Sequence, residues 1–291
     1  MRWLVTGAGG MLALDVRAVL AEQGEQVDAR DRAGLDVLDP DAVQDAVSAL
    51  AGPHGPGVVV NCAAWTDVDG AEVHEAEATR VNGEAVALIA AACAQTGARL
   101  LHVSTDYVFA GDGTLPYGED DPTAPLNAYG RSKLAGEQAV LRLHPEAGYV
   151  VRTAWLYGEH GRSFVSTMAR LAREKGPDGT LDVVDDQRGQ PTWSRDLASQ
   201  LVALARAEQA PPGVYHGTSS GETTWFGLAR AVFEELGHDP ERVRPTTSDK
   251  FVRPAPRPAY SVLGHERWAA AGLAPIRDWR EALSGWAAAR G

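Results

Sequence analysis

The stretch Arg2-Trp-Leu-Val-Thr-Gly7-Ala-Gly-Gly10-Met-Leu-Ala13 decides the fold of this 291-residue chain. It begins as a short apolar run, continues as a glycine-rich turn and leads into a helical pattern from residue 11 to about residue 23. Glycines let a backbone approach a pyrophosphate closely, and the first turn of a helix offers free N–H groups with partial positive charge. In this strand–turn–helix setting, the spacing Gly7-x-x-Gly10-x-x-Ala13 predicts a dinucleotide-binding turn rather than a plain tight turn.

Strand-like and helix-like segments continue to alternate as far as residue 158. Strands are expected at residues 2–6, 27–29, 58–61, 99–104 and 149–152, and helices at residues 11–23, 39–50, 72–96 and 129–143. Such alternation with short connections predicts an α/β fold with a Rossmann-like, doubly wound parallel sheet. In that fold, ligands bind at the carboxyl ends of the strands.

The rhythm loosens after residue 158. Helices are expected at residues 164–174, 194–209 and 225–236, a strand at 181–184, and two short helices near the C-terminus. We therefore expect residues 1–158, with part of 181–217, to form the dinucleotide-binding domain. Residues from about 159 to 291 should form mostly a smaller C-terminal substrate-binding lobe, interleaved with the first domain.

Composition excludes several classes of protein. The chain has 27 basic and 39 acidic residues, and 27 − 39 gives a net charge of −12, which argues against a binder of nucleic acid or of anionic membranes. Its longest apolar run, Ala85–Ala94, is shorter than the roughly 18–20 residues of a membrane helix. Cys62 and Cys93 are expected to be buried free thiols, which fits a reducing compartment. We expect a cytoplasmic monomer or homodimer, and no metal is predicted because the histidines lack ligand spacing.

The end of the second expected strand bears on the choice of cofactor. It has the sequence Arg30-Asp31-Arg32, in which an acid favours a free ribose 2′-hydroxyl and arginines favour a 2′-phosphate. NADH and NADPH therefore both stay open, with the balance slightly toward NADPH, and a solvated charge cluster is the alternative. Asp36 and Val37 come next along the chain and are expected to border the adenine.

Tyr129 and Lys133 open a predicted helix and lie one turn apart on the same face. The chain has 7 tyrosines and 3 lysines, so about 0.07 such pairs would arise by chance. A nearby ammonium is expected to lower the pKa of a tyrosine, which is otherwise a sluggish acid–base group at neutral pH. Ser104 and Thr105 end the fourth expected strand, where a hydroxyl can bind a substrate carbonyl beside the tyrosine.

Together these features resemble the extended short-chain dehydrogenase/reductase superfamily. Finer matches over nearly the whole chain resemble the dTDP-4-dehydrorhamnose reductase family. They are Asn61-Cys-Ala-Ala-Trp-Thr-Asp-Val-Asp-Gly-Ala-Glu72, Ser104-Thr-Asp-Tyr-Val-Phe-Ala-Gly111, Pro125-Leu-Asn-Ala-Tyr-Gly-Arg-Ser-Lys-Leu-Ala-Gly-Glu137, Arg152-Thr-Ala-Trp-Leu-Tyr-Gly158, Asp186-Gln-Arg-Gly-Gln-Pro-Thr192 and Arg253-Pro-Ala-Pro-Arg-Pro258.

The resemblance implies NAD(P)H-dependent reduction of the C4 keto group of a dTDP-6-deoxy-4-ketohexose, to dTDP-L-rhamnose or a close relative. It makes Tyr129 the proton donor, Lys133 the group that binds the nicotinamide ribose, and Thr105 the group that positions the keto oxygen. Further family positions follow. By the resemblance, the pyrophosphate is contacted by Gly10, Met11 and Leu12. The cofactor is lined by Ala64, Trp65 and Thr66. The sugar nucleotide is contacted by Val68, Asp106 and Trp155.

Two arginines are candidates for the substrate diphosphate, which needs cations despite the net charge. Arg253 and Arg257 lie in a proline-stiffened segment, and the alternative is that they are solvated loop arginines.

Several alternatives stay open. Tyr107 follows Asp106 where sugar-nucleotide dehydratases have a glutamate base, so dehydration is disfavoured. A 4-ketoreductase or epimerase for another activated deoxysugar, such as an antibiotic sugar of the dihydrostreptose type, is the main rival. A non-catalytic regulatory subunit is disfavoured because the Tyr129/Lys133 pair is present. Some relatives are described with magnesium, but no ligand set for it is evident here.

Overall fold

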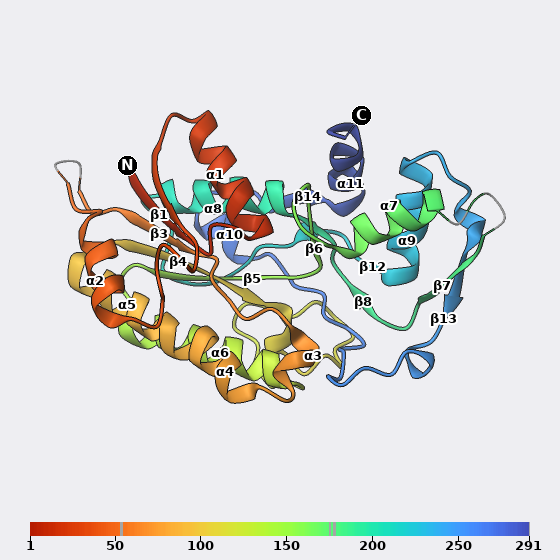
Figure 1. Cartoon of the computed structure of the whole chain (residues 1–291), viewed down its shortest axis with the longest axis horizontal. Coiled ribbons are helices and arrows are strands. Elements are labelled where there is room, and N and C mark those ends of the chain that lie inside the picture. The colour runs from red at the N-terminus through yellow and green to blue at the C-terminus, as the bar shows by residue number, and fades with distance from the viewer. Residues whose placement is uncertain (53–54, 175, 177–178, 291) are drawn as a thin grey trace.

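The computed structural model describes residues 1–52, 55–174, 176 and 179–290 (Figure 1). Within these residues a central sheet contains six parallel strands in the order β10-β5-β4-β3-β1-β2. The strands are β1 (Arg2–Thr6), β2 (Gln26–Arg30), β3 (Val58–Asn61), β4 (Arg99–Thr105), β5 (Gly148–Thr153) and β10 (Gly213–His216). The predicted Rossmann-like α/β fold is confirmed.

The order in which strands are added to the sheet reverses at β1, because β2 lies on one side of β1 and β3 on the other. This is the switch point at which such sheets leave a crevice for ligands. The glycine turn follows β1 and the segment beginning at Cys62 follows β3, so both border that crevice.

Helices cover both faces of the sheet (Figure 1). One face is covered by α1 (Met11–Glu22) and α8 (Ser194–Arg206), and the other by α2 (Pro40–Ser48), α5 (Ala85–Thr96) and α6 (Ala128–Leu143). The central residues Val58–Val60 are buried because both faces are covered. Burying each of these valines contributes about 1.5–3 kcal/mol.

Helix α2 starts where the Asp39 side chain accepts the N–H groups of Asp41 and Ala42.

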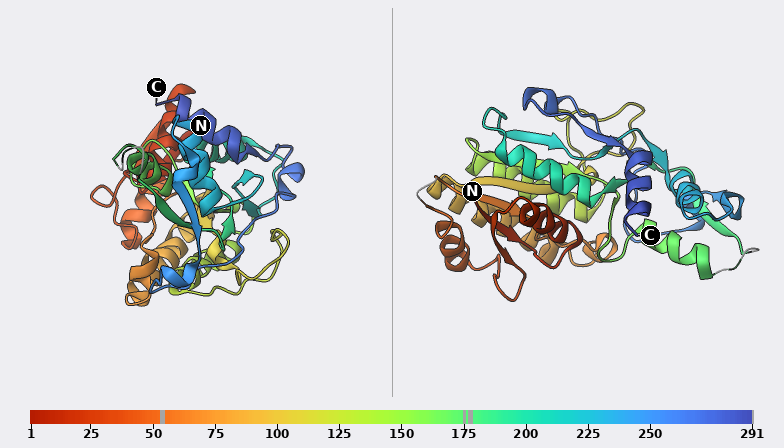
Figure 2. Two further views of the ribbon diagram at one scale, coloured as in Figure 1. Left: turned by 90° about the vertical axis from the view of Figure 1, so that its right-hand side faces the viewer. Right: turned by 90° about the horizontal axis from the view of Figure 1, so that it is seen from above.

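A second group of elements, called the outer lobe below, lies beyond one end of the sheet (Figures 1 and 2). Its core contains residues of α7 (Phe164–Glu174), α9 (Trp225–Glu235) and α11 (Trp279–Ala288), with β7 (Leu181–Val184) paired in parallel to β13 (Val243–Thr246). Short strand pairs join the two parts: β6 (Leu156–Tyr157) with β9 (Thr192–Trp193), β8 (Arg188–Gly189) with β12 (Thr223–Thr224), and β11 (Ser219–Ser220) with β14 (Ile276–Asp278). The short helix α10 (Arg267–Ala270) packs near β10.

The helix expected over residues 72–96 is more broken than predicted. The structure has α3 (Val68–Ala71), α4 (Glu75–Thr79), a π-helical segment (Arg80–Glu84) and then α5. Asn82 lies in the π-helical segment, and its amide bonds to Trp65 and Ser132. The interruption therefore falls at a buried polar residue just before the apolar helix α5. The hydrophobic pattern of the sequence does not predict such a break.

Three smaller expectations were also wrong. The helix expected to reach Gln209 ends at Arg206, and strand β10 was not among the expected strands because its four residues give little pattern. Cys93 is a buried free thiol as expected, whereas Cys62 is only partly buried.

In the part of the chain described here, no helix has the length and apolar character needed to cross a membrane.

Candidate active site

A cavity of about 470 Å³ lies at the carboxyl ends of β1, β3, β4 and β5. The glycine turn, the segment after β3 and helix α6 all contribute to its wall. It brings together most of the predicted catalytic, pyrophosphate and sugar residues, namely Gly10, Met11, Leu12, Ala64, Thr66, Val68, Thr105, Asp106, Tyr129, Lys133 and Trp155.

The glycine turn fits closely against the segment after β3. Gly7 has φ +66°, and a Cβ there would lie 2.7 Å from the Ala63 nitrogen, so a larger residue would push the two segments apart. Gly10 is the N-cap of α1 and has no side chain to accept the first N–H groups of the helix. Those groups therefore stay available to an anionic ligand.

The segment after β3 is held by Asn82. The Asn82 amide accepts from the Trp65 nitrogen at 2.8 Å and donates to the Trp65 carbonyl at 3.0 Å and to the Ser132 hydroxyl at 2.9 Å. Ala64, Thr66 and Val68 consequently line the cavity. Trp65 does not line the cavity, because its ring packs into a small apolar cluster with Tyr129 and three alanines.

Tyr129 and Thr105 are brought together by the start of α6. Asn127 is the N-cap, and its side chain accepts the Gly130 N–H at 2.8 Å. A Cβ on Gly130 would lie 2.2 Å from the Tyr107 carbonyl oxygen, so only glycine allows α6 to approach the end of β4 this closely. The Thr105 side chain is close enough to the Tyr129 hydroxyl to lower the pKa of the phenol.

The expected lowering of the Tyr129 pKa by Lys133 was wrong for the protein without ligand. Burial raises the pKa of Tyr129 to about 12, with a further contribution from the Asp106 carboxylate, and Lys133 is not among the causes. Lys133 is 2% exposed, and its Nζ donates to the Val103 carbonyl at 2.7 Å. Burial lowers the pKa of Lys133 from 10.5 to about 8, so the ammonium is still the main form at neutral pH but is easier to deprotonate than in a free lysine.

Asp106 is 3% exposed and lies between Thr105 and the outer lobe. Its Oδ1 accepts from the Thr105 hydroxyl at 3.0 Å, while Oδ2 has no hydrogen-bond partner among the described residues. Burial raises the pKa of Asp106 to about 6, and the nearby Ser261 side chain opposes that rise although no hydrogen bond within normal distance joins the two. An unsatisfied, buried carboxylate at the edge of a cavity indicates a ligand-binding group.

Two stacked tryptophans form the outer wall of the cavity. Trp155 has the strained φ of +46°, and its ring stacks on Trp225 with centroids 3.5 Å apart and planes 10° apart. Trp225 also lines a second cavity of about 490 Å³ in the outer lobe, so it stands between the two. Sequence reasoning missed Trp225 because it is 70 residues from Trp155 and lies on another lobe.

The second cavity contains both predicted diphosphate arginines, Arg253 and Arg257. Arg257 Nη2 lies 2.9 Å from Asp69 Oδ1, and Arg253 Nη1 lies 3.8 Å from Asp69 Oδ2. Asp69 is on α3, so these ion pairs connect the Pro/Arg segment to the sheet domain. Arg257 is thus held in place, whereas Arg253 is 63% exposed and makes only a loose contact.

A third cavity of about 330 Å³ lies where β2 ends, and it is lined by Arg30 and Asp31, the residues predicted to lie near the cofactor ribose. The guanidinium of Arg30 pairs with Asp28 at 2.7 Å, and Asp31 Oδ1 accepts the N–H groups of residues 33 and 34. Arg17 also lines this cavity and was missed, although its position two turns along α1 on the Leu14 side was a usable signal.

Asp36 and Val37, expected to border the adenine, do not line this cavity. Asp36 instead accepts the Leu38 N–H at 3.0 Å, and Val37 packs against the core beneath α2.

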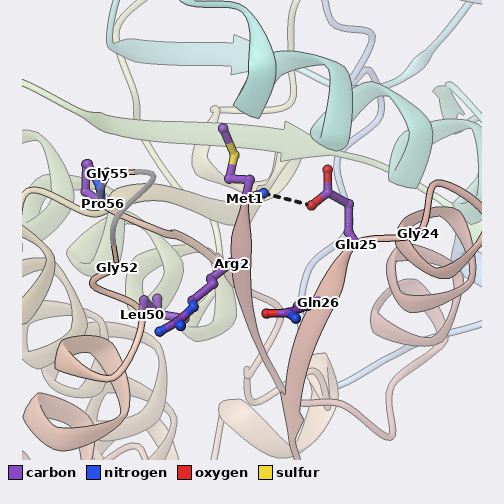
Figure 3. Close-up of a pocket in the computed structure, with 9 residues that line it drawn as sticks. All are labelled: Met1, Arg2, Gly24, Glu25, Gln26, Leu50, Gly52, Gly55 and Pro56. Carbon is purple, nitrogen blue, oxygen red and sulfur yellow. Dashed lines mark hydrogen bonds and ion pairs between the residues drawn. The ribbon is translucent and has the colours of Figure 1, made fainter.

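One further pocket, of about 330 Å³, lies at the amino ends of β1 and β2 (Figure 3). Arg2 and Gln26 begin those strands, and the Met1 amine pairs with Glu25 at 3.1 Å. It is therefore at the opposite end of the sheet from the predicted catalytic residues. Over the described ranges, no three or more His, Cys, Asp or Glu side chains are grouped so as to hold a metal ion.

Known proteins resemble this chain over nearly its whole length. The family model described as RmlD substrate binding domain matches residues 1–289. A dTDP-4-dehydrorhamnose reductase of Streptomyces griseus is 54% identical over 286 residues, covering 97% of this chain and 92% of the relative. A dTDP-4-keto-6-deoxy-D-glucose reductase of Streptomyces niveus is 52% identical over 283 residues, covering 97% and 95%. The crystal structure of a dTDP-4-dehydrorhamnose reductase of Bacillus anthracis in complex with NADP is 35% identical, covers 98% of each chain and has a TM-score of 0.90.

Proposed function

The chain belongs to the family described by the RmlD substrate binding domain, and from this premise we propose that it is an NAD(P)H-dependent 4-ketoreductase of dTDP-6-deoxy-4-ketohexoses. The proposed reaction is reduction of dTDP-4-dehydro-L-rhamnose to dTDP-L-rhamnose. The observation that carries the proposal is one cavity that joins a bare helix N-terminus to Tyr129, Lys133 and Thr105. The first feature suits a dinucleotide, and the second suits reduction of a ketone.

The residues present fit a nicotinamide dinucleotide. Gly10 leaves the N-terminus of α1 uncapped, and the cavity continues past Ala64 and Thr66 to Lys133. We infer that Met11 and Leu12 hold the pyrophosphate through their N–H groups and that Lys133 holds the nicotinamide ribose. In this arrangement residues 1–158, with part of 181–217, form the dinucleotide-binding domain, and most of 159–291 binds the sugar nucleotide.

In the proposed mechanism Tyr129 donates its phenolic proton to the C4 oxygen. Its pKa of about 12 keeps the proton on the phenol at neutral pH, which is the form a reductase needs. Thr105 and Tyr129 bracket the oxygen where negative charge develops. When bound, NAD(P)H supplies the hydride that C4 receives. The stacked Trp155 and Trp225 close the outer side of the cavity and limit access of water.

NADPH is the better fit of the two cofactors. Arg30 is already paired with Asp28, and the Asp31 carboxylate already accepts two backbone N–H groups. Arg17 makes a 3.3 Å hydrogen bond to the Ala8 carbonyl and lines the same cavity, so we propose it as the main cation for a ribose 2′-phosphate.

Val68, Asp106 and Trp155 are proposed to contact the sugar, and Arg253 and Arg257 the diphosphate. The first three line the inner cavity and the two arginines line the outer one, which matches the order of sugar and diphosphate in a nucleotide sugar. A related candidate function is reduction of another dTDP-4-keto-6-deoxyhexose, since the 52% identical relative is a dTDP-4-keto-6-deoxy-D-glucose reductase.

The proposal is tested by following loss of nicotinamide absorbance with dTDP-4-dehydro-L-rhamnose and, separately, dTDP-4-keto-6-deoxy-D-glucose. Turnover that prefers the first sugar supports the proposed substrate, and a preference for the second moves the assignment to the related function. Tyr129→Phe should bind NADPH normally and lose most turnover, because the phenol oxygen is removed and the ring kept. Tyr149→Phe is the matched control, since the Tyr149 hydroxyl donates to the Ala210 carbonyl at 2.9 Å away from the cavity, and full turnover by Tyr129→Phe refutes the assigned role.

A further inference from the structure

A row of buried polar side chains lies behind the active-site cavity and ends on Lys133. It crosses the sheet from Thr6 on β1 through Asn61 on β3 and His102 on β4 to α6, and each of the four side chains is at most 2% exposed. Thr6 Oγ1 lies 2.6 Å from Asn61 Oδ1, Asn61 Nδ2 lies 3.0 Å from His102 Nδ1, and His102 Nε2 lies 3.4 Å from Lys133 Nζ. Burying four polar groups is costly unless they are paired, so the row calls for an explanation.

Hydrogen-bond directions along this row are fixed by one backbone group. The Ala63 N–H donates to Asn61 Oδ1 at 3.2 Å, and an N–H cannot act as an acceptor. The Asn61 side chain must therefore present Oδ1 to Ala63 and Thr6, and its NH₂ to His102. Since Nδ1 of His102 accepts that hydrogen bond, the neutral ring has its proton on Nε2.

The Nε2–H of His102 consequently points at Lys133. An ammonium at Lys133 would place N–H groups of both partners against each other, whereas a neutral amine offers a lone pair to Nε2–H. Lys133 already has a hydrogen-bond acceptor in the Val103 carbonyl at 2.7 Å, so it does not need His102 as a second one. A separation of 3.4 Å is long for a hydrogen bond, which fits two donors in opposition.

We propose that His102 is a positioning residue for Lys133: its Nε2–H, oriented by Asn61, opposes protonation of Lys133 in the protein without cofactor. The ring of His102 stays neutral itself, because burial and the neighbouring Lys133 hold its pKa well below the usual range. Position 136 on α6 is glycine, where a Cβ would lie 2.2 Å from the Asn82 carbonyl oxygen and 3.2 Å from His102 Nε2, so a larger residue would push α6 away.

Other groups that face Lys133 act differently. The carboxylate of Glu137, one turn along α6, favours the ammonium, but it is committed to Arg152 on β5 with Nη2–Oε2 at 2.7 Å. The Cys62 thiol after β3 also favours the ammonium once it is ionised, yet burial raises its own pKa to about 12, so it is neutral at working pH. Tyr129 precedes Lys133 by one turn and is neutral as well. Burial is what lowers the pKa of Lys133, and His102 is the neighbour that we propose acts in the same direction.

The first test reads the histidine tautomer in the wild-type protein. Histidine labelled with ¹⁵N on both ring nitrogens gives distinct two-bond correlation patterns for the two neutral tautomers, and His102→Phe assigns the resonance. The expected result is an Nε2–H tautomer that persists to low pH. An Nδ1–H tautomer, or a charged ring at neutral pH, overturns the proposal without any need for a variant to fold well.

The second test measures the charge of Lys133 directly. The chain has 3 lysines, so ¹³C,¹⁵N-lysine labelling gives few signals, and Lys133→Met assigns the relevant one. In His102→Phe the pKa of Lys133 should rise by about one unit or more, because the opposing N–H is gone and the ring volume is kept. Asn61→Asp should also raise the pKa of Lys133, since a carboxylate accepts a hydrogen bond from Nδ1–H, favours that tautomer of His102 and leaves Nε2 as an acceptor. An unchanged or lowered pKa in both variants overturns the proposal.

A matched control is His144→Phe, which removes another buried ring whose Nε2 contacts a backbone carbonyl at 2.9 Å, far from Lys133 along α6. It should leave the Lys133 titration unchanged. The inference rests on the proposed function only in treating Lys133 as an active-site group. Both spectroscopic tests use the full chain without substrate, so loss of the proposed reductase activity and failure of the tautomer assignment remain separate results.

Discussion

Replacing Asp106 by Asn should stabilise the protein, and more so at alkaline than at acidic pH. The carboxyl group is 3% exposed and burial raises its pKa to about 6, against an ordinary value of 3.8. In the range between these values the folded state holds a proton that the unfolded state has lost. As far as this group is concerned, the free energy of unfolding is therefore highest below about pH 4, and it falls as the pH rises through 6.

The magnitude follows from the two pKa values. At pH 8 both states are ionised, and the penalty for burying the charge is about 3 kcal/mol, from roughly 1.4 kcal/mol per pKa unit. At pH 5 the folded state is mostly protonated, and the penalty is about 1.6 kcal/mol by the same relation. The difference of about 1.4 kcal/mol is the quantity to measure, because effects of the substitution that do not depend on pH cancel in it.

Urea unfolding of the wild type and of Asp106→Asn at pH 5 and pH 8 supplies that difference. Asn keeps the shape and leaves Oδ1 free to accept from Thr105, so the fold should be preserved. Asp45→Asn on the exposed face of α2 makes the same chemical change and should give no pH-dependent difference. If the gain from Asp106→Asn is equal at the two pH values, or larger at pH 5, the carboxylate is not held in a destabilised state and the reasoning fails.

Three further substitutions test the choice of cofactor, the buried ion pair on α6 and the proposed diphosphate site. Arg17→Ala should raise the Kd of NADPH about tenfold and leave that of NADH unchanged, because a charge-assisted hydrogen bond contributes about 1.5–3 kcal/mol. Fluorescence titration measures both constants, with Arg142→Ala on the exposed side of α6 as the control, and equal losses for both cofactors would contradict the assignment. Glu137→Gln should lower the free energy of unfolding by about 3–5 kcal/mol, since it leaves the 4% exposed Arg152 buried without a countercharge; a change below 1 kcal/mol in urea would be inconsistent with the pair. Arg257→Ala should raise the KM for the nucleotide sugar about tenfold or more with little effect on NADPH binding, and an unaltered KM would remove it from the diphosphate site.

Much of the sheet domain was predictable from sequence because its signals are local. Gly7 and Gly10 fall between a strand and a helix, and the pair Tyr129/Lys133 lies one turn apart, so spacing alone placed these residues at the same end of the sheet. The structure gathers them in one cavity. The N-caps Asp39 and Asn127 likewise mark helix starts by side chains that accept nearby N–H groups.

What the sequence did not disclose depends on contacts between distant residues. The stacking of Trp225 on Trp155 and the pairing of Arg257 with Asp69 join segments that no periodicity connects. The error on the Tyr129 pKa has the same origin. An i, i+4 spacing predicts an ammonium nearby, but burial of the phenol is a property of the folded protein and outweighs it.

Transfer of deuterium tests directly whether the protein moves a hydride from NADPH to C4 of the ketosugar. With NADPH deuterated at the reactive C4 position of the nicotinamide and dTDP-4-dehydro-L-rhamnose as substrate, we expect a dTDP-L-rhamnose product that contains one deuterium, located at C4 of the sugar by NMR. A product without deuterium at C4, or no product from protein that binds NADPH, would contradict it.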